Sequence, residues 1–122
     1  MFVYRLASRL YAANSSEGAR RYGGRWNRPE TPVIYTSATR SLAALEVIVH
    51  YGAIPADYRI IVIEAPNSLA VENVELKDLP DDWPDEDSGL DTATYGTEWA
   101  RSLRTAVLRV PSALYAPSII SY

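Results

Sequence analysis

The sequence predicts one domain that combines β-strands with α-helices. Residues 58–65 (YRIIVIEA) are rich in β-branched side chains and alternate in polarity, which is typical of a strand. Residues 41–51 are apolar on nearly all sides, as expected of a helix sandwiched in the interior. The 122 residues, 48% of them hydrophobic, suffice for one modest core and contain no internal repeat.

Shorter segments complete the expected domain, and they share periodic apolar residues bounded by turn formers. They are strands at residues 1–6, 33–37, 69–76 and 105–110, a helix at 95–104 with Trp99 and Leu103 inward, and an apolar end at 113–122 that could begin another strand. Strands 58–65 and 69–76 are expected to be neighbours in the sheet, because only a short turn separates them.

Residues 14–32 are expected to form a long irregular loop, since they contain three glycines, two prolines and clustered arginines. The paired Gly23 and Gly24 would let main-chain N–H groups turn toward an anion. Arg25 could then add a bidentate contact to a phosphate. The alternative is a loop whose arginines are simply solvated. The spacing matches neither a Walker loop nor the Rossmann fingerprint.

Glu46 is the one acid in the apolar helix 41–51. Burying an ionised carboxylate costs several kcal/mol unless partners offset it. At helical spacing Glu46 shares a face with Ala43, Val47 and His50. Two interpretations stay open: a structural salt bridge with an arginine, or a perturbed carboxylate facing a functional cleft. His50, the only histidine, is expected to cap or pack rather than bind a ligand.

Composition excludes several classes of protein. The net charge of −3 and pI of about 5.1 argue against a broad surface for nucleic acid. The absence of cysteine excludes disulfides and thiolate zinc sites. No run is apolar and long enough for a secretion signal or a membrane span, so a soluble cytoplasmic protein is expected. The acidic segment 78–91 is expected to be a solvated loop, with a docking patch for a basic partner as the alternative.

Four ordered segments resemble a known family. They are GGRWN at 23–27, VIYTS at 33–37, LAALEVIVH at 42–50 and VLRVPSA at 107–113. Their order and spacing resemble the RES domain of bacterial toxin–antitoxin pairs, from about Tyr4 to Ser112. That family is named for an arginine, a glutamate and a serine, and the matching positions are Arg25, Glu46 and Ser112.

The resemblance implies a single RES domain over residues 1–122 with an α+β fold similar to ADP-ribosyltransferases. In that fold a split mixed β-sheet is flanked by helices, with a cleft between its halves. It also implies a toxin that depletes NAD, passing ADP-ribose to water, phosphate or protein, and that assembles with an Xre-type antitoxin as a homodimer or larger complex. Related chains continue past VPSA with a further strand, so this chain is expected to be either a short member or truncated at its C-terminus.

The expected chemistry is cleavage of the nicotinamide–ribose bond. Nicotinamide leaves a cationic ring as a neutral molecule, so no general acid is required. The site must instead stabilise oxocarbenium character on the ribose, and a carboxylate suits that task. Glu46 is the expected catalytic carboxylate, Arg25 and Tyr35 complete the expected catalytic set, and no metal is expected.

The remaining site residues are expected to hold the dinucleotide. Arg25, helped by Arg5 on the opening strand, would neutralise the two phosphates. Tyr35 would place an aromatic face against the cationic nicotinamide ring, worth roughly 0.5–2 kcal/mol. The resemblance gives Ser112 a hydrogen bond to the amide or ribose. The neighbours that complete the expected NAD-binding set are Gly24, Asn27 and Ser37.

Trp26 is expected to anchor the loop by packing. Arg5, if it points inward, would need an anionic partner, and the alternative is an edge-strand arginine in solvent. Two rival functions stay open. One is a protein-modifying ADP-ribosyltransferase toxin, and the other is a non-catalytic binding module that uses the acidic segment 78–91.

Overall fold

Six strands pair into one mixed sheet in the computed structural model, which describes residues 1–84, 92–112 and 119–121. The strands are β1 (Phe2–Ser8), β2 (Thr36–Ser37), β3 (Tyr58–Glu64), β4 (Val71–Asn73), β5 (Val107–Pro111) and β6 (Ile119–Ser121). Their order across the sheet is β3-β1-β2-β6-β5-β4. Neighbouring strands are antiparallel except β4 and β5, which are parallel.

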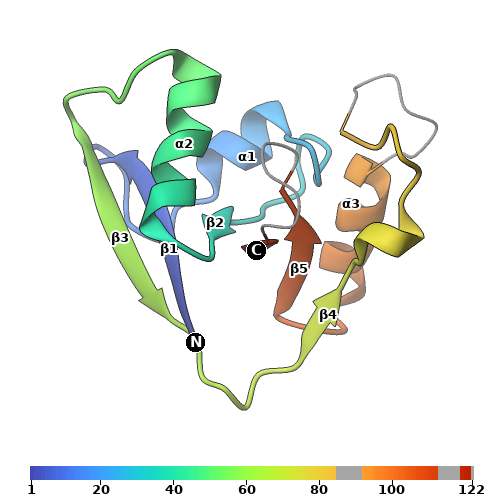
Figure 1. Ribbon diagram of the computed structural model, residues 1–122. Helices are drawn as coiled ribbons and strands as arrows, with labels where there is room; N and C mark the ends of the chain where they lie inside the picture. The colour runs from blue at the N-terminus through green and yellow to red at the C-terminus, as the bar shows by residue number, and fades with distance from the viewer. Residues whose placement is uncertain (85–91, 113–118, 122) are drawn as a thin grey trace.

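Helices flank the two halves of this sheet, which are the strands β3, β1 and β2 and the strands β6, β5 and β4. They are α1 (Glu17–Tyr22), α2 (Arg40–Tyr51), α3 (Thr92–Ser102) and the short 3-10 helix η1 (Leu76–Asp78). In Figure 1, α2 lies on the β1 and β3 side, α3 lies on the β4 and β5 side, and α1 lies between them. The α+β class and the mixed sheet flanked by helices are therefore confirmed.

The predicted pairing of strands 58–65 and 69–76 is wrong. β3 pairs along its whole length with β1, whereas β4 pairs with β5, so β3 and β4 occupy opposite edges of the sheet (Figure 1). The second strand is also shorter than predicted, covering only Val71–Asn73. Sequence neighbours usually pair, but the apolar pattern of a strand does not encode its partner.

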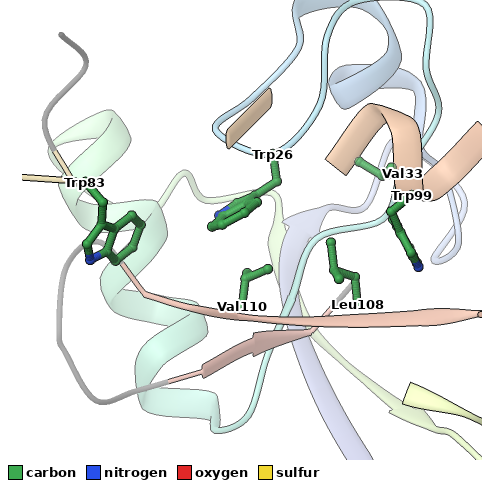
Figure 2. Packing of buried hydrophobic residues seen from close by; sticks show 6 residues of the cluster. All are labelled: Trp26, Val33, Trp83, Trp99, Leu108 and Val110. Carbon is green, nitrogen blue, oxygen red and sulfur yellow. The ribbon is translucent and has the colours of Figure 1, made fainter. Parts of the chain in front are cut away.

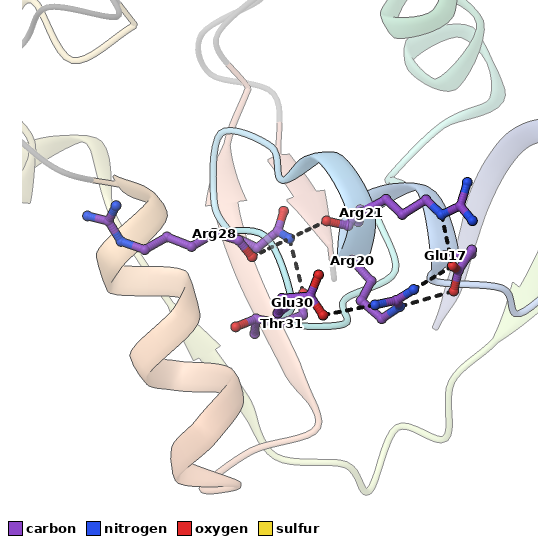
Figure 3. A network of polar contacts seen from close by, with 8 residues as sticks. Glu17, Arg20, Arg21, Arg28, Glu30 and Thr31 are labelled. Atoms are coloured by element: carbon purple, nitrogen blue, oxygen red, sulfur yellow. Dashed lines mark hydrogen bonds and ion pairs between the residues drawn. The ribbon is translucent and has the colours of Figure 1, made fainter.

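The predicted irregular loop 14–32 contains helix α1. Glu17 forms ion pairs with Arg20 and Arg21 at i+3 and i+4, the spacing that brings side chains together on a helix. The helix ends at Gly23, whose φ of 72° is unfavourable for other residues. Figure 3 shows Arg20 between Glu17 and Glu30, so this arginine links α1 to the later part of the loop.

Helix α2 is not the enclosed helix that its composition predicts. The Thr39 hydroxyl caps its start by accepting from the Leu42 amide, and Gly52 ends it in the left-handed conformation. Its buried residues are Leu42, Ala43 and Val47, whereas its large exposed residues are Leu45, Ile48, Val49 and Tyr51. One face packs against β1 and β2, and the opposite face is exposed.

Among the described helices, none has the length and apolarity that crossing a membrane demands.

The main core lies in the half formed by α3 and β5, and loop residue Trp26 is at its centre. Its buried members are Trp26, Val33, Trp83, Trp99, Leu108 and Val110. Figure 2 shows the three tryptophans facing Leu108 and Val110 of β5. Two predictions, that Trp26 anchors its loop by packing and that Trp99 points inward, are confirmed. The inward position of Leu103 is wrong, because α3 ends at Ser102 and Leu103 is exposed.

Candidate active site

Residues from three distant parts of the chain meet around Glu46. Glu46 lies in the middle of α2, and Ser112 directly follows β5. The Ser112 hydroxyl donates to Glu46 Oε1 at 3.3 Å. Arg25, on the loop after α1, is close enough for its positive charge to act on the same carboxylate. Of the arginine, glutamate and serine singled out in the sequence, the last two are therefore in contact, and the arginine lies within electrostatic range of the glutamate.

Glu46 is half-buried, and its surroundings decide its charge. Burial raises the pKa of the Glu46 carboxyl above its ordinary value, because water solvates the charged form less well there. The Ser112 hydrogen bond and the positive charge of Arg25 act in the opposite direction and offset part of this rise. Within the described ranges, no ion pair closer than 4 Å includes Glu46. A close structural salt bridge therefore does not account for this acid.

Arg25 differs from Arg20 and Arg21 of the same loop. Arg20 and Arg21 are engaged in ion pairs with glutamates, whereas Arg25 forms none with the residues that the structure describes. Its Cζ atom lies 5.8 Å from the ring centroid of Trp83 instead. A guanidinium that lies over an aromatic ring can still donate its N–H groups to an anion.

Trp83 was missed as a residue that shapes the site. It is 5% exposed, belongs to the core cluster and lies under the Arg25 guanidinium. The available signal was a lone tryptophan within an acidic segment, since a large aromatic residue in a purely solvated loop is unusual. The rest of that segment, residues 85–91, lies outside the described residues.

The paired glycines do not form the expected anion-binding nest. The Gly23 amide donates to the Ala19 carbonyl and the Gly24 amide donates to the Asn27 carbonyl, both at 2.9 Å. These N–H groups are therefore used inside the loop, and the prediction of a main-chain phosphate cradle at this pair is wrong. Gly24 is required for a different reason, because a Cβ atom there would lie 2.6 Å from the Tyr35 hydroxyl.

The Tyr35 hydroxyl bridges two residues of the Arg25 loop. It accepts from the Trp26 amide at 3.1 Å and donates to Asn27 Oδ1 at 2.5 Å. The ring is partly buried against the core cluster. Tyr35 therefore fixes the main chain on the C-terminal side of Arg25. Contact between its ring and nicotinamide stays a prediction.

Asn27 braces the loop from inside. Its side-chain amide donates to the carbonyls of Ala19 at 2.8 Å and Thr31 at 3.1 Å, and its carbonyl accepts from Tyr35. Asn27 is 1% exposed, so in this arrangement its side chain offers no surface to a ligand. Its expected contact with NAD is replaced by a role in shaping the loop.

Arg5 and Ser37 lie on adjacent strands. The Arg5 guanidinium donates to the Ala13 carbonyl at 3.1 Å, and burial lowers the pKa of Arg5. Within the described residues no carboxylate lies within 4 Å of it, so its expected anionic partner is not supplied by this part of the chain. Ser37 is buried on β2 opposite Tyr4 of β1. Their contacts with NAD stay predictions.

Comparisons with known proteins agree with the sequence resemblance. The RES domain family matches residues 2–120. The Prs ADP-ribosylating toxin of Sphingobium sp. (strain YBL2) is 36% identical over 113 residues, covering 88% of this chain and 70% of the relative. Toxin Res of Photorhabdus laumondii is 35% identical over 118 residues, covering 93% of this chain and 75% of the relative.

A solved structure with a similar fold is the crystal structure of the M. tuberculosis MbcT–MbcA toxin–antitoxin complex. It matches with a TM-score of 0.77 and 25% identity, covering 98% of this chain and 71% of the matched chain. Because the family pattern spans nearly the whole sequence and the relatives exceed 30% identity, this chain belongs to the RES domain family.

Proposed function

We propose that this protein is the toxin of a toxin–antitoxin pair and that it consumes NAD by cleaving the nicotinamide–ribose bond. The observation that carries the proposal is the position of Glu46. It is a half-buried carboxylate outside any close ion pair of the described residues, with the Ser112 hydroxyl and the charge of Arg25 directed at it. Perturbed carboxylates with specific partners are typical of functional sites.

Glu46 would stabilise the cationic ribose as nicotinamide departs. A negative charge aimed at the position where positive charge develops lowers the barrier, and it does so more strongly in a site that is shielded from water. Only the ionised carboxylate can act in this way. The Ser112 hydrogen bond and the Arg25 charge both favour ionisation against the effect of burial.

Arg25 would bind the diphosphate of NAD. Its guanidinium is held over the Trp83 ring and is not engaged in an ion pair with the described residues, which leaves its donors available to phosphate oxygens. Arg5 could contribute a second charge from β1, since its partner within the described chain is a main-chain carbonyl rather than an acid. Tyr35 and Ser112 would contact the nicotinamide ring and the amide or ribose, respectively.

The proposed partner is an Xre-type antitoxin that blocks the site in the cytoplasm. The solved structure with the same fold is a complex between a toxin and its antitoxin, which supports a protein inhibitor of this kind. The acceptor of ADP-ribose would be water or inorganic phosphate. Transfer to a protein is the second candidate, and it is favoured by the name of one relative, an ADP-ribosylating toxin.

The proposal is tested by incubating the purified protein with NAD and separating the products by chromatography, with and without inorganic phosphate. Nicotinamide together with free or phosphorylated ADP-ribose is expected. A parallel incubation with labelled NAD and cell lysate measures transfer to protein. Label on a protein band would establish the second candidate, and no nicotinamide release at any enzyme concentration would support a non-catalytic binding module.

A further inference from the structure

We infer that helix α3 positions Arg25 for its ligand, and that Thr92, at the start of this helix, is a positioning residue for that arginine. The inference rests on the proposed function, because it assigns to Arg25 the binding of NAD phosphates. Thr92 and Arg25 are 67 residues apart in the sequence. Nothing in the sequence pattern links them.

Helix α3 contacts the Arg25 loop through successive residues. The Thr92 hydroxyl donates to the Arg25 carbonyl at 2.5 Å. One turn further along the helix, Gly96 lies against the main chain of Trp26. The next residue, Thr97, accepts a hydrogen bond through its hydroxyl from the Arg28 amide at 2.9 Å. The helix therefore holds the main chain of the loop on both sides of Trp26.

Gly96 permits this close approach. A Cβ atom on Gly96 would lie 1.7 Å from the Trp26 carbonyl oxygen, so no other residue fits without moving the loop or the helix. Glycine in a helix interior costs about 1 kcal/mol relative to alanine. Direct contact between the two main chains explains its presence in the middle of α3.

The Thr92 hydrogen bond is well suited to fixing a position. Thr92 is 8% exposed, so water competes poorly for its hydroxyl and for the carbonyl that it reaches. Arg25 is thereby held at two points, its carbonyl by Thr92 and its guanidinium over the Trp83 ring. An arginine restrained in this way loses less conformational freedom when it binds a phosphate.

Loss of the Thr92 hydroxyl should therefore weaken NAD binding more than the chemical step. Glu46 and Ser112 approach each other from α2 and the end of β5, and their contact does not involve Thr92. Thr92→Val preserves the shape of the side chain and removes the donor. Thr92→Ser retains the donor. Glu98→Gln, on an exposed part of the same helix, is a matched control.

The experiment measures KM and kcat for nicotinamide release by the parent and these three variants. Thr92→Val is expected to raise KM about five- to tenfold, the factor associated with losing one hydrogen bond, with kcat changed less than about twofold. Thr92→Ser and Glu98→Gln should resemble the parent. A Thr92→Val enzyme with the parental KM would overturn the inference, as would a Thr92→Ser enzyme as impaired as Thr92→Val.

Amide hydrogen exchange on the same proteins tests positioning without turnover. The Trp26 and Gly24 amides are hydrogen-bonded within the loop, so their exchange should become several-fold faster in Thr92→Val and remain parental in Thr92→Ser. If the parent releases no nicotinamide, the proposed function fails, and the exchange rates still decide whether Thr92 holds the loop. Unchanged exchange at both amides would show that it does not.

Discussion

Ser112 Oγ lies 3.3 Å from Glu46 Oε1, although the two residues are 66 positions apart, one directly after β5 and the other on helix α2. Ser112 is 1% exposed and follows β5, whereas Glu46 is half-buried on α2. The contact connects α2 to the end of β5, where the charge of Arg25 also acts on Glu46. The Ser112 hydroxyl favours the ionised form of the Glu46 carboxyl, and this effect can be measured as a change in the pH dependence of the reaction.

The pH dependence of the reaction should reveal the raised pKa of Glu46. Because burial raises this pKa and the carboxylate must be ionised to act, activity should fall with decreasing pH at a higher pH than for an ordinary glutamate. Ser112→Ala removes a contact that lowers the pKa, so the acidic limb should move to still higher pH. The measurement is kcat/KM against pH for both enzymes, since this ratio reports the pKa values of the free enzyme. A limb that moves to lower pH in Ser112→Ala would contradict this account of Glu46.

Glu46→Gln should stabilise the fold at neutral pH. A carboxyl whose folded pKa is raised makes the native state less stable as pH increases from the ordinary glutamate pKa through the raised value. The gain in melting temperature should therefore be present at neutral pH and vanish below the ordinary pKa.

Glu72→Gln is the matched control and should have the opposite effect. The pKa of Glu72 is lowered by its hydrogen bond to Arg104, so this pair stabilises the fold at neutral pH and the contribution is lost as pH falls through the folded pKa. Thermal unfolding of both variants across pH checks the pair of predictions. A Glu46→Gln variant that melts at a lower temperature than the parent at neutral pH, as Glu72→Gln is expected to do, would contradict the unfavourable burial of the Glu46 charge.

Tyr35→Phe separates the two roles of this residue. The substitution keeps the aromatic face but leaves the Trp26 amide and Asn27 Oδ1 without their shared partner. It should lower the free energy of unfolding by about 1–3 kcal/mol and raise KM through disorder of the Arg25 loop. Urea unfolding and steady-state kinetics measure the two effects. Parental stability and parental KM would mean that only the ring of Tyr35 matters.

Gly96→Ala should be strongly destabilising even though alanine favours helices. Its Cβ atom would lie 1.7 Å from the Trp26 carbonyl oxygen, and displacing packed main chain costs about 1–3 kcal/mol or more. A lower midpoint of urea unfolding is the expected result. Ala100→Gly, a helix change without such a clash, should cost only about 1 kcal/mol in propensity before any loss of packing. A Gly96→Ala variant as stable as the parent would mean that the main chain of α3 is not in close contact with the Arg25 loop.

Local patterns in the sequence predicted the elements better than their arrangement. The strand at 58–65 and the helix at 41–51 are close to the observed β3 and α2, because alternation and helical periodicity are local properties. The position of β4 beside β5 was not predicted, since it depends on contacts between distant segments. The exposed face of α2 was missed because composition alone does not indicate whether a second layer covers it.

The candidate site was predicted in part for similar reasons. Glu46 stood out as an acid in an apolar helix, and the family resemblance added Arg25 and Ser112. The inward use of the Gly23 and Gly24 amides was not predictable from glycine spacing, because the spacing does not specify which carbonyl each amide reaches in the folded loop. Thr92 left no signal, since its role depends on a hydrogen bond across 67 residues.

The central claim is that the Glu46 carboxylate stabilises the ribose cation as nicotinamide leaves. The most direct test is the rate of nicotinamide release by Glu46→Gln at saturating NAD, with binding of NAD measured separately by calorimetry. The account predicts a loss of at least about 10²-fold in kcat with a folded protein that still binds NAD. Release at the parental rate by the folded variant would contradict it.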